Sequence, residues 1–215
     1  MVASGGLRER RKAETRSRLG DVAARLFAER GYDTVSISDV ARAAGVADQT
    51  VYNYFPTKAD LVLDRAGEVL QKTRAAIASR APSQTTADAM RTLVHEDIDR
   101  YVDDDPTLAR GQFPAQCRLS AALRRRALEF YDELTTQITS ALIDTALNPH
   151  PMLLRSHAAA LVAVTQQITE AIGDAIIADA DRAVTRRILT ESADDALDDI
   201  AIWWRRIDQG SRTQS

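Results

Sequence analysis

The stretch that decides the fold is Ser36–Lys58, which reads SISDVARAAGVADQTVYNYFPTK. Its apolar spacing predicts two short helices, Ser36–Ala44 and Asp48–Phe55. Gly45 between them permits the positive φ that a sharp turn requires. Pro56 ends the second helix, because the residue before a proline is driven away from helical angles. Two short helices joined in this way are typical of a helix-turn-helix unit.

The two helices begin differently. Ser36 and Asp39 resemble a capping box, in which the hydroxyl accepts a free backbone N–H and the carboxylate reaches back to the cap. The second helix has Ala47 at the corresponding position, so we expect its neighbour Asp48 to take over the capping. Loss of a good cap costs about 1 kcal/mol.

The side chains of the two helices divide into an apolar and a polar set. We expect an inner face formed by small and branched residues, namely Val40, Ala41, Ala44, Val46 and Val51, with Phe55 in the core. The second helix then directs polar groups outward, namely Gln49, Thr50, Asn53 and Tyr54, with Tyr52 at the edge. Amide and hydroxyl groups suit hydrogen bonds to base edges and phosphates. Stacking of Tyr54 inside the protein is an equally open alternative.

Helical periodicity continues over the rest of the chain, and no segment alternates with period two. The predicted helices are Leu19–Arg30, Thr57–Ala81, Thr86–Asp104, Ser120–Leu147, Pro151–Ala178 and Ser192–Asp208, with a short piece at Pro106–Phe113. The sequence therefore predicts an all-α protein. A three-helix DNA-binding domain is expected at 1–60, a larger helical domain at 61–209 and a disordered tail at 210–215.

The composition is that of a globular protein. Hydrophobic residues make up 45% and charged residues 27% of the 215-residue chain, which excludes a collagen-like or wholly disordered chain. Cys117 is the only cysteine, so neither a disulfide framework nor a multi-cysteine zinc site is expected. The first residues lack an apolar secretion signal. The longest uncharged run, Ser156–Thr169, is shorter than the roughly 20 apolar residues of a membrane span. We therefore expect a soluble, cytoplasmic protein with no membrane partner.

The net charge of −3 hides an asymmetry between the two parts of the chain. Residues 1–58 hold ten basic and seven acidic residues, whereas residues 59–215 hold eighteen and twenty-four. The basic excess is densest in the Arg8–Lys12 arm and continues at Arg16 and Arg18. A basic front on an acidic body suggests a polyanionic partner for the front alone. A solubilising, frayed N-terminus explains the charge equally well.

The block Arg16–Leu63 resembles the N-terminal domain of TetR-family transcriptional regulators. That family has an apolar first helix ending in Gly-Tyr or Gly-Phe, a second helix ending in Ala-Gly-Val, and Thr-x-Tyr-x-x-Phe followed by Pro-Ser-Lys. In this chain the corresponding residues are Leu26–Phe27, Gly31–Tyr32, Ala44–Val46, Thr50–Phe55 and Pro56–Lys58. The resemblance covers about a quarter of the chain.

The resemblance implies a sequence-specific contact with double-stranded operator DNA. It assigns phosphate and base contacts to Thr50 and Tyr52 and a phosphate contact to Lys58. The remaining candidates for the DNA interface are Arg16, Ser36, Ser38, Asp48, Gln49, Asn53 and Tyr54. Asp48 departs from the family pattern, because a carboxylate repels phosphates unless it accepts from a cytosine amino group.

The resemblance also implies that the larger domain binds a small effector and forms a homodimer. Candidate lining residues are Leu93, Phe113, Leu123, Phe130, Tyr131, Leu134, Leu161 and Thr165. Their apolar character favours a hydrophobic or amphipathic effector, and a faint likeness to a subgroup with acyl-CoA-like ligands points the same way. Candidate dimer contacts are Leu154, Ala158, Ile168, Ile172, Leu197, Ile200 and Trp204, with one ring of Trp203–Trp204 turned inward and the other sideways. Each of these residues also fits an ordinary core position.

No enzyme motif stands out, and no cofactor or metal is expected. His95 and Asp99 have a spacing compatible with metal binding, but a surface hydrogen-bonded pair between them is favoured. Cys117 beside Arg118 could be a redox sensor, although a lone helical cysteine is usually inert. We expect a repressor that a small molecule releases from DNA by a population shift. The alternative is a helical small-molecule-binding or enzymatic bundle without DNA-binding activity.

Overall fold

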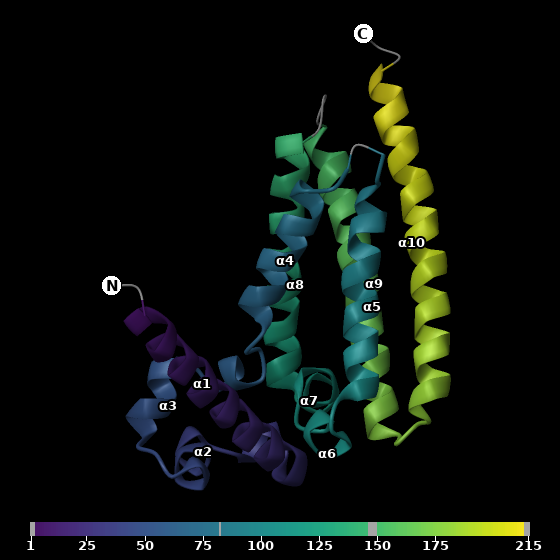
Figure 1. Ribbon diagram of the computed structural model, residues 1–215. Coiled ribbons are helices and arrows are strands. Elements are labelled where there is room, and N and C mark those ends of the chain that lie inside the picture. The colour runs from purple at the N-terminus through teal and green to yellow at the C-terminus, as the bar shows by residue number, and fades with distance from the viewer. Residues whose placement is uncertain (1–2, 82, 146–149, 213–215) are drawn as a thin grey trace. The chain divides into compact units, whose positions relative to one another are not determined.

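The computed structural model describes residues 3–81, 83–145 and 150–212, and within these ranges all regular structure is helical (Figure 1). The predicted all-α class is confirmed. The chain divides into two compact units. Unit 1 comprises residues 1–64 and 104–124, and unit 2 comprises residues 65–103 and 125–215. The expected division between residues 60 and 61 stays a prediction, and the sequence did not anticipate that residues 104–124 join the N-terminal unit.

Unit 1 is a helix-turn-helix domain supplemented by a segment from further along the chain. Its elements are α1 (Ala3–Arg30), η1 (Tyr32–Thr34), α2 (Ile37–Ala44), α3 (Asp48–Tyr54), η2 (Ala59–Leu61), α6 (Pro106–Ala109) and α7 (Phe113–Leu119). Its core is apolar and includes the fully buried Leu19, Phe27, Val40, Val51 and Phe55. Phe55 therefore lies in the core, as expected.

The supplementary segment packs closely on α1. A Cβ placed on Gly111 would lie 1.6 Å from the Ala24 carbonyl oxygen, so only glycine permits this approach. The buried amide of Gln116 accepts a hydrogen bond from the Tyr32 backbone N–H at 3.0 Å and donates to the Phe27 and Arg110 carbonyls at 3.3 and 2.6 Å. These bonds attach α6 and α7 to the first helix and its following turn.

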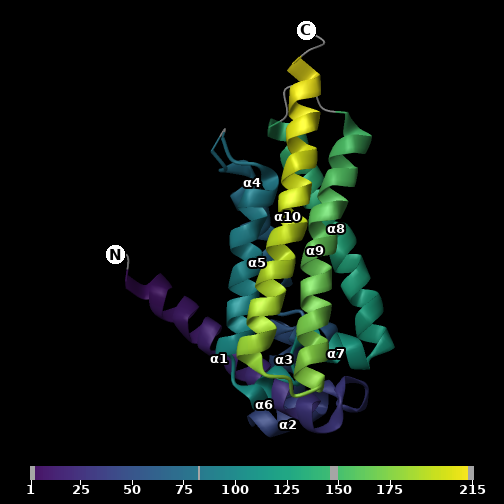
Figure 2. The same ribbon diagram turned by 90° about the vertical axis from the view of Figure 1, so that its right-hand side faces the viewer.

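Unit 2 is a bundle of longer helices. It contains α4 (Ala66–Ala78), α5 (Thr86–Asp103), α9 (Pro151–Ile177), α10 (Arg182–Arg212) and most of α8 (Ala121–Thr145). In Figure 2, α10 runs beside both α5 and α9, and these three helices pack on one another. By length and composition alone α9 is apolar enough to cross a membrane. It is also a core helix of this bundle, with Leu161 and Ala158 fully buried. Buried core helices can be as long and as apolar as membrane-spanning ones.

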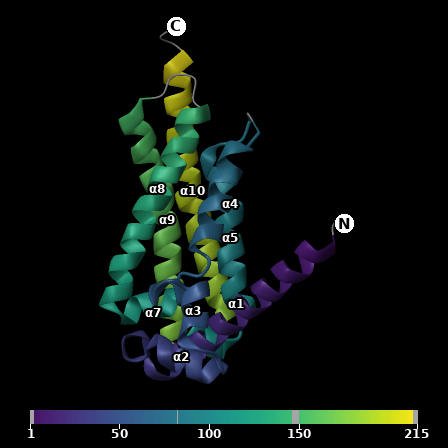
Figure 3. The ribbon, with the colours of Figure 1, turned by 90° about the vertical axis from the view of Figure 1, so that its left-hand side faces the viewer.

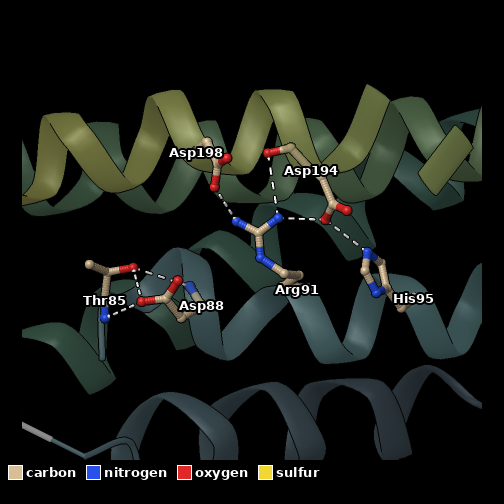
Figure 4. A network of polar contacts seen from close by, with 6 residues as sticks. All are labelled: Thr85, Asp88, Arg91, His95, Asp194 and Asp198. Atoms are coloured by element: carbon tan, nitrogen blue, oxygen red, sulfur yellow. Dashed lines mark hydrogen bonds and ion pairs between the residues drawn. The ribbon is translucent and has the colours of Figure 1, made fainter. Parts of the chain in front are cut away.

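A row of charged contacts joins α5 to α10 (Figure 4). Arg91 donates to the carboxylates of Asp194 and Asp198, each at 2.5 Å, and His95 Nε2 lies 2.9 Å from Asp194. Burial alone would raise the pKa of Asp194, but the hydrogen bonds from Arg91 and His95 outweigh it and lower the pKa. Arg186 of α10 pairs with Asp99. The predicted pair between His95 and Asp99 is therefore wrong, because each finds its partner on α10.

His157 of α9 is fully buried in unit 2. His157 Nε2 lies 2.5 Å from Thr86 Oγ1, and both Trp203 and Trp204 pack against the imidazole with ring centroids 5.2 and 4.5 Å away. Burial, with a smaller effect from the nearby charge of Arg80, lowers the pKa of His157 to about 4. The expectation that one tryptophan ring turns sideways is wrong, since both contact this histidine.

Several helix boundaries differ from the predicted ones. The first helix begins at Ala3 instead of Leu19, and the last begins at Arg182 instead of Ser192. Thr57 hydrogen-bonds to Asp60 of the short turn η2, and α4 begins only at Ala66, so the predicted continuous helix Thr57–Ala81 is wrong. α10 continues through residues 210–212 of the expected tail, while residues 213–215 and the predicted break at 146–149 lie outside the described residues.

Candidate nucleic-acid interface

The turn between α2 and α3 is fixed by backbone conformation and capping. Gly45 has φ 68°, and the N–H groups of Gly45 and Val46 donate to carbonyls in the last turn of α2. At the other end of α2, the Ser36 hydroxyl accepts from the Asp39 N–H at 3.1 Å, while the Ser36 N–H donates to the Asp39 carboxylate at 3.0 Å. The predicted capping box is confirmed. Its hydrogen bonds lower the pKa of the Asp39 carboxyl.

The recognition helix α3 begins without a side-chain cap. Ala47 occupies the N-cap and Asp48 is the first helical residue, so the expectation that Asp48 would cap the helix is wrong. Its carboxylate instead accepts a short hydrogen bond from the Ser38 hydroxyl of α2. This contact ties the two helices together. It also gives the Asp48 carboxylate a hydrogen-bond donor, which weakens its repulsion of nearby phosphates.

The exposed face of α3 is polar. Val51 is fully buried, whereas the side chains that flank it reach solvent: Tyr52 is 46% exposed, and Gln49 and Asn53 are also exposed. Gln49 Nε2 donates to Asn53 Oδ1 at 3.1 Å, which holds two amides side by side one turn apart. Thr50 and Tyr54 are half-buried at the edges of this face. Amide pairs of this kind can donate to and accept from base edges.

Arg16 has a different environment from the one expected. Its guanidinium donates to the carbonyls of Tyr54 at 2.6 Å and Asp64 at 3.2 Å, and its carbon lies 4.3 Å from the centre of the Phe55 ring. Arg16 therefore ties α1 to the C-terminal end of α3, and these bonds use two of the five N–H donors of its guanidinium. A role in DNA contact stays a prediction for this residue.

Lys58 lies at the start of η2, close to the turn η1 that follows α1. Its ammonium is 4.2 Å from the centre of the Tyr32 ring and 3.5 Å from the Asp33 carbonyl. Burial lowers the pKa of Lys58, although the nearby charge of Asp33 opposes this shift. Thr57, which precedes it, forms a second hydroxyl–carboxylate box with Asp60. The turn after the recognition helix is thus held by side-chain contacts of its own.

The candidate effector residues are divided between the units. Phe113 and Leu123 belong to unit 1, and the other six belong to unit 2. Leu123, Phe130, Tyr131, Leu134 and Leu161 are buried, whereas Leu93, Phe113 and Thr165 are half-buried. Five of the candidate dimer residues, Leu154, Ala158, Ile168, Ile172 and Leu197, are buried within the single chain and leave no surface for a second copy at those positions. Ile200 and Trp204 are half-buried.

Two further side chains were not found from the sequence. Gln116 and His157 are polar residues inside apolar helices, where periodicity alone indicates only core positions. Cys117, considered as a redox sensor, is buried in α7 next to Gln116. Among the described residues, no group of three or more His, Cys, Asp or Glu side chains is placed to hold a metal ion.

Together these features define an all-α protein whose N-terminal unit presents a short polar helix from a helix-turn-helix. Residues 19–64 match the family described as "Bacterial regulatory proteins, tetR family". The helix-turn-helix region of this chain therefore matches the TetR family. This family consists of transcriptional regulators and not enzymes, in agreement with the expected class.

A curated relative supports the assignment over part of the chain. The HTH-type transcriptional repressor KstR2 of Rhodococcus jostii is 36% identical over 95 residues, which is 41% of this chain and 45% of the relative. This chain spans less than half the length of the curated relatives it matches.

Solved structures extend the likeness in fold to most of the chain. NalD of Pseudomonas aeruginosa, the secondary repressor of the MexAB-OprM efflux pump, is 19% identical with a TM-score of 0.55, covering 87% of this chain and 97% of that one. FadR of Bacillus subtilis, solved with stearoyl-CoA, is 20% identical with a TM-score of 0.54, covering 86% and 97%. At these identities the likeness concerns the fold alone.

Proposed function

We propose that this protein is a homodimeric transcriptional repressor that binds a palindromic operator through α3 and is released by a small hydrophobic or amphipathic effector. The observation that carries the proposal is the exposed polar face of α3, held on a buried core by Val51 and Phe55. Gln49, Tyr52 and Asn53 offer the hydrogen-bonding groups that read base edges in a major groove. Because operator binding requires access to chromosomal DNA, the proposed location of this protein is the cytoplasm.

A second copy of the chain is part of the proposal. One seven-residue helix reads few base pairs, and a two-fold dimer presents two such helices to half-sites about 34–36 Å apart, or a multiple of that. Support for a dimer surface comes from α9, where Ser156, Ala159 and Ala163 are exposed at helical spacing. Small residues allow close approach of helices, and Met152, 72% exposed, extends this stripe. α10 adds the exposed Val184, Ile188 and Ile202.

The proposed effector is an amphiphile such as a long-chain acyl-CoA. The interior of unit 2 is mostly apolar, with Phe130, Leu134 and Leu161 buried, and apolar surroundings favour a ligand that carries an acyl chain. The stearoyl-CoA bound to FadR gives a concrete probe. Stearoyl-CoA is expected to weaken operator binding, whereas coenzyme A without the acyl chain is expected to have no effect. Equal DNA affinity with and without stearoyl-CoA contradicts this choice of effector.

The DNA-binding proposal is tested with a duplex selected from a random library by the full-length protein. Tyr52→Ala is expected to lower the affinity for the selected duplex at least tenfold while leaving the oligomeric state unchanged. Leu119→Ala, at a side chain of unit 1 that is 61% exposed and lies outside α3, is the matched control and should bind as the wild type does. Failure to select any preferred sequence would instead favour a helical ligand-binding or enzymatic bundle without DNA-binding activity.

A further inference from the structure

Residues 8–18 of α1 form a basic stretch that precedes the buried face of this helix. Residues 8–18 include six basic and two acidic side chains, and residues 8–14 are all exposed. Figure 3 shows this part of α1 projecting beyond α2 and α3. Because residues 8–14 are exposed, packing within unit 1 does not account for this extension, and an isolated helix of this length is marginal in water.

The register of α1 determines which of these side chains face the recognition helix. Leu19 and Ala23 are fully buried and mark the face of α1 that packs on the domain. Arg16 continues that face and reaches the Tyr54 carbonyl at the C-terminal end of α3. Side chains four residues apart share a helix face, so Lys12 and Arg8 continue the same face toward the N-terminus.

The distances suit the rim of a DNA groove. With a rise of about 1.5 Å per residue, Lys12 lies about 6 Å and Arg8 about 12 Å beyond Arg16 along the axis of α1. The major groove is about 12 Å wide, and a helix lying in it has phosphates along both sides. Neither Arg8 nor Lys12 is ion-paired with any other residue that the structure describes, so both charges are available.

We propose that Arg8 and Lys12 form a phosphate clamp, which binds the DNA backbone next to the half-site occupied by α3. The clamp rests on the proposed function, because it requires α3 to lie on a duplex. Arg16 holds α1 against the end of α3 and is a positioning residue, while Arg8 and Lys12 contact phosphate. Phosphate contacts carry no sequence information, so the clamp raises affinity without changing the preferred sequence.

The same helix provides a matched control. Arg10 is two residues from both Arg8 and Lys12, which places it about 160° around the helix, and Arg18 is related in the same way to Arg16. Both are exposed. The double variant Arg10→Ala/Arg18→Ala therefore removes the same charge as Arg8→Ala/Lys12→Ala but from other faces. Alanine has the highest helix propensity, so neither change should unfold α1, and circular dichroism verifies this.

The experiment measures the affinity of full-length variants for the selected duplex over a series of salt concentrations. Each phosphate contact contributes about 0.9 to the slope of log affinity against log salt. In a dimer, loss of two contacts from each subunit should make the slope of Arg8→Ala/Lys12→Ala shallower by about 3.6. The control slope should change by less than half as much, and the preference for the selected duplex over a scrambled one should stay the same for both variants.

The outcomes separate the clamp from the proposed function. Equal slopes for the two double variants overturn the clamp while leaving operator binding intact. A changed sequence preference in Arg8→Ala/Lys12→Ala also overturns it, because the residues would then read bases. If the wild type itself prefers no sequence, the proposed function fails together with the clamp.

Discussion

His157 is a basic side chain enclosed by aromatic rings. Its pKa is lowered to about 4, mainly by burial, so the neutral imidazole is the form that the folded chain holds at neutral pH. An unfolded chain has an ordinary histidine with a pKa of about 6.5 and binds a proton more readily. Stability contributed by this residue is therefore present above pH 6.5 and is lost as the pH falls toward 4.

This shift predicts a pH dependence that one substitution removes. Between pH 7.5 and pH 5, His157 should cost the wild type about 2 kcal/mol of unfolding free energy. His157→Gln retains an amide that can hydrogen-bond to Thr86 but does not titrate. The unfolding free energy of this variant should therefore fall by about 2 kcal/mol less than that of the wild type between pH 7.5 and pH 5. Urea unfolding followed by tryptophan fluorescence at the two pH values measures the difference. Identical pH dependence in both proteins would show that this histidine does not titrate as described.

At the level of single elements, the turn between α2 and α3 depends on one glycine. Gly45 has φ 68°, a conformation that costs other residues about 1–2 kcal/mol. No atom lies within 4 Å of a Cβ added there, so a substitution meets backbone strain and no steric clash. The strain would fall on the angle between the two helices of the DNA-binding unit.

Gly45→Ala is accordingly expected to lower stability by about 1 kcal/mol. Gly67→Ala in α4 is the control, because its added Cβ also meets no atom within 4 Å and its φ is not positive. That change should be neutral or stabilising by up to about 1 kcal/mol. Thermal unfolding of both variants provides the comparison, and a loss of stability in Gly67→Ala equal to that in Gly45→Ala would contradict this reading.

The attachment of α6 and α7 to α1 depends on the amide of Gln116. Gln116→Ala removes the acceptor of the buried Tyr32 N–H and the donor to the Arg110 carbonyl, which should cost about 2–4 kcal/mol. Hydrogen exchange should then rise at Tyr32 and through residues 104–124. Gln112→Ala, at a half-buried glutamine one helical turn earlier, should change neither. Unchanged exchange at Tyr32 in Gln116→Ala would show that its side chain does not hold this segment.

The elements differ in how well the sequence predicted them. The helix-turn-helix followed from local chemistry, since the Ser36 cap, Gly45 and Pro56 act on neighbouring residues. The start of α1 could not be predicted, because residues 3–18 lack an apolar stripe. They extend a helix whose buried face begins only at Leu19. The interior positions of Leu154 and Leu197, proposed as dimer contacts, depend on which neighbouring helices cover them. Periodicity identifies an apolar face but not its partner, and for the same reason it did not reveal the contacts of Arg16 or His95.

For the whole molecule, the proposed dimer makes a prediction about α9. Ala163 is exposed in the single chain, within the stripe of small residues proposed as the dimer surface. Ala163→Arg should force a charged side chain into that surface and give monomers at micromolar concentration. Ala75→Arg, at an exposed alanine of α4, is the matched control and should stay dimeric. Sedimentation velocity distinguishes the two, and a dimer in both variants would place the interface elsewhere.

The central claim is that two copies of α3 bind a duplex with two-fold symmetry, and a footprint on the selected DNA tests it most directly. Hydroxyl-radical cleavage of the bound duplex should reveal two protected half-sites arranged as an inverted repeat, with centres about 34–36 Å apart or a multiple of that. Both should disappear together in Tyr52→Ala. A single protected block without symmetry, or protection that Tyr52→Ala leaves unchanged, would contradict the account.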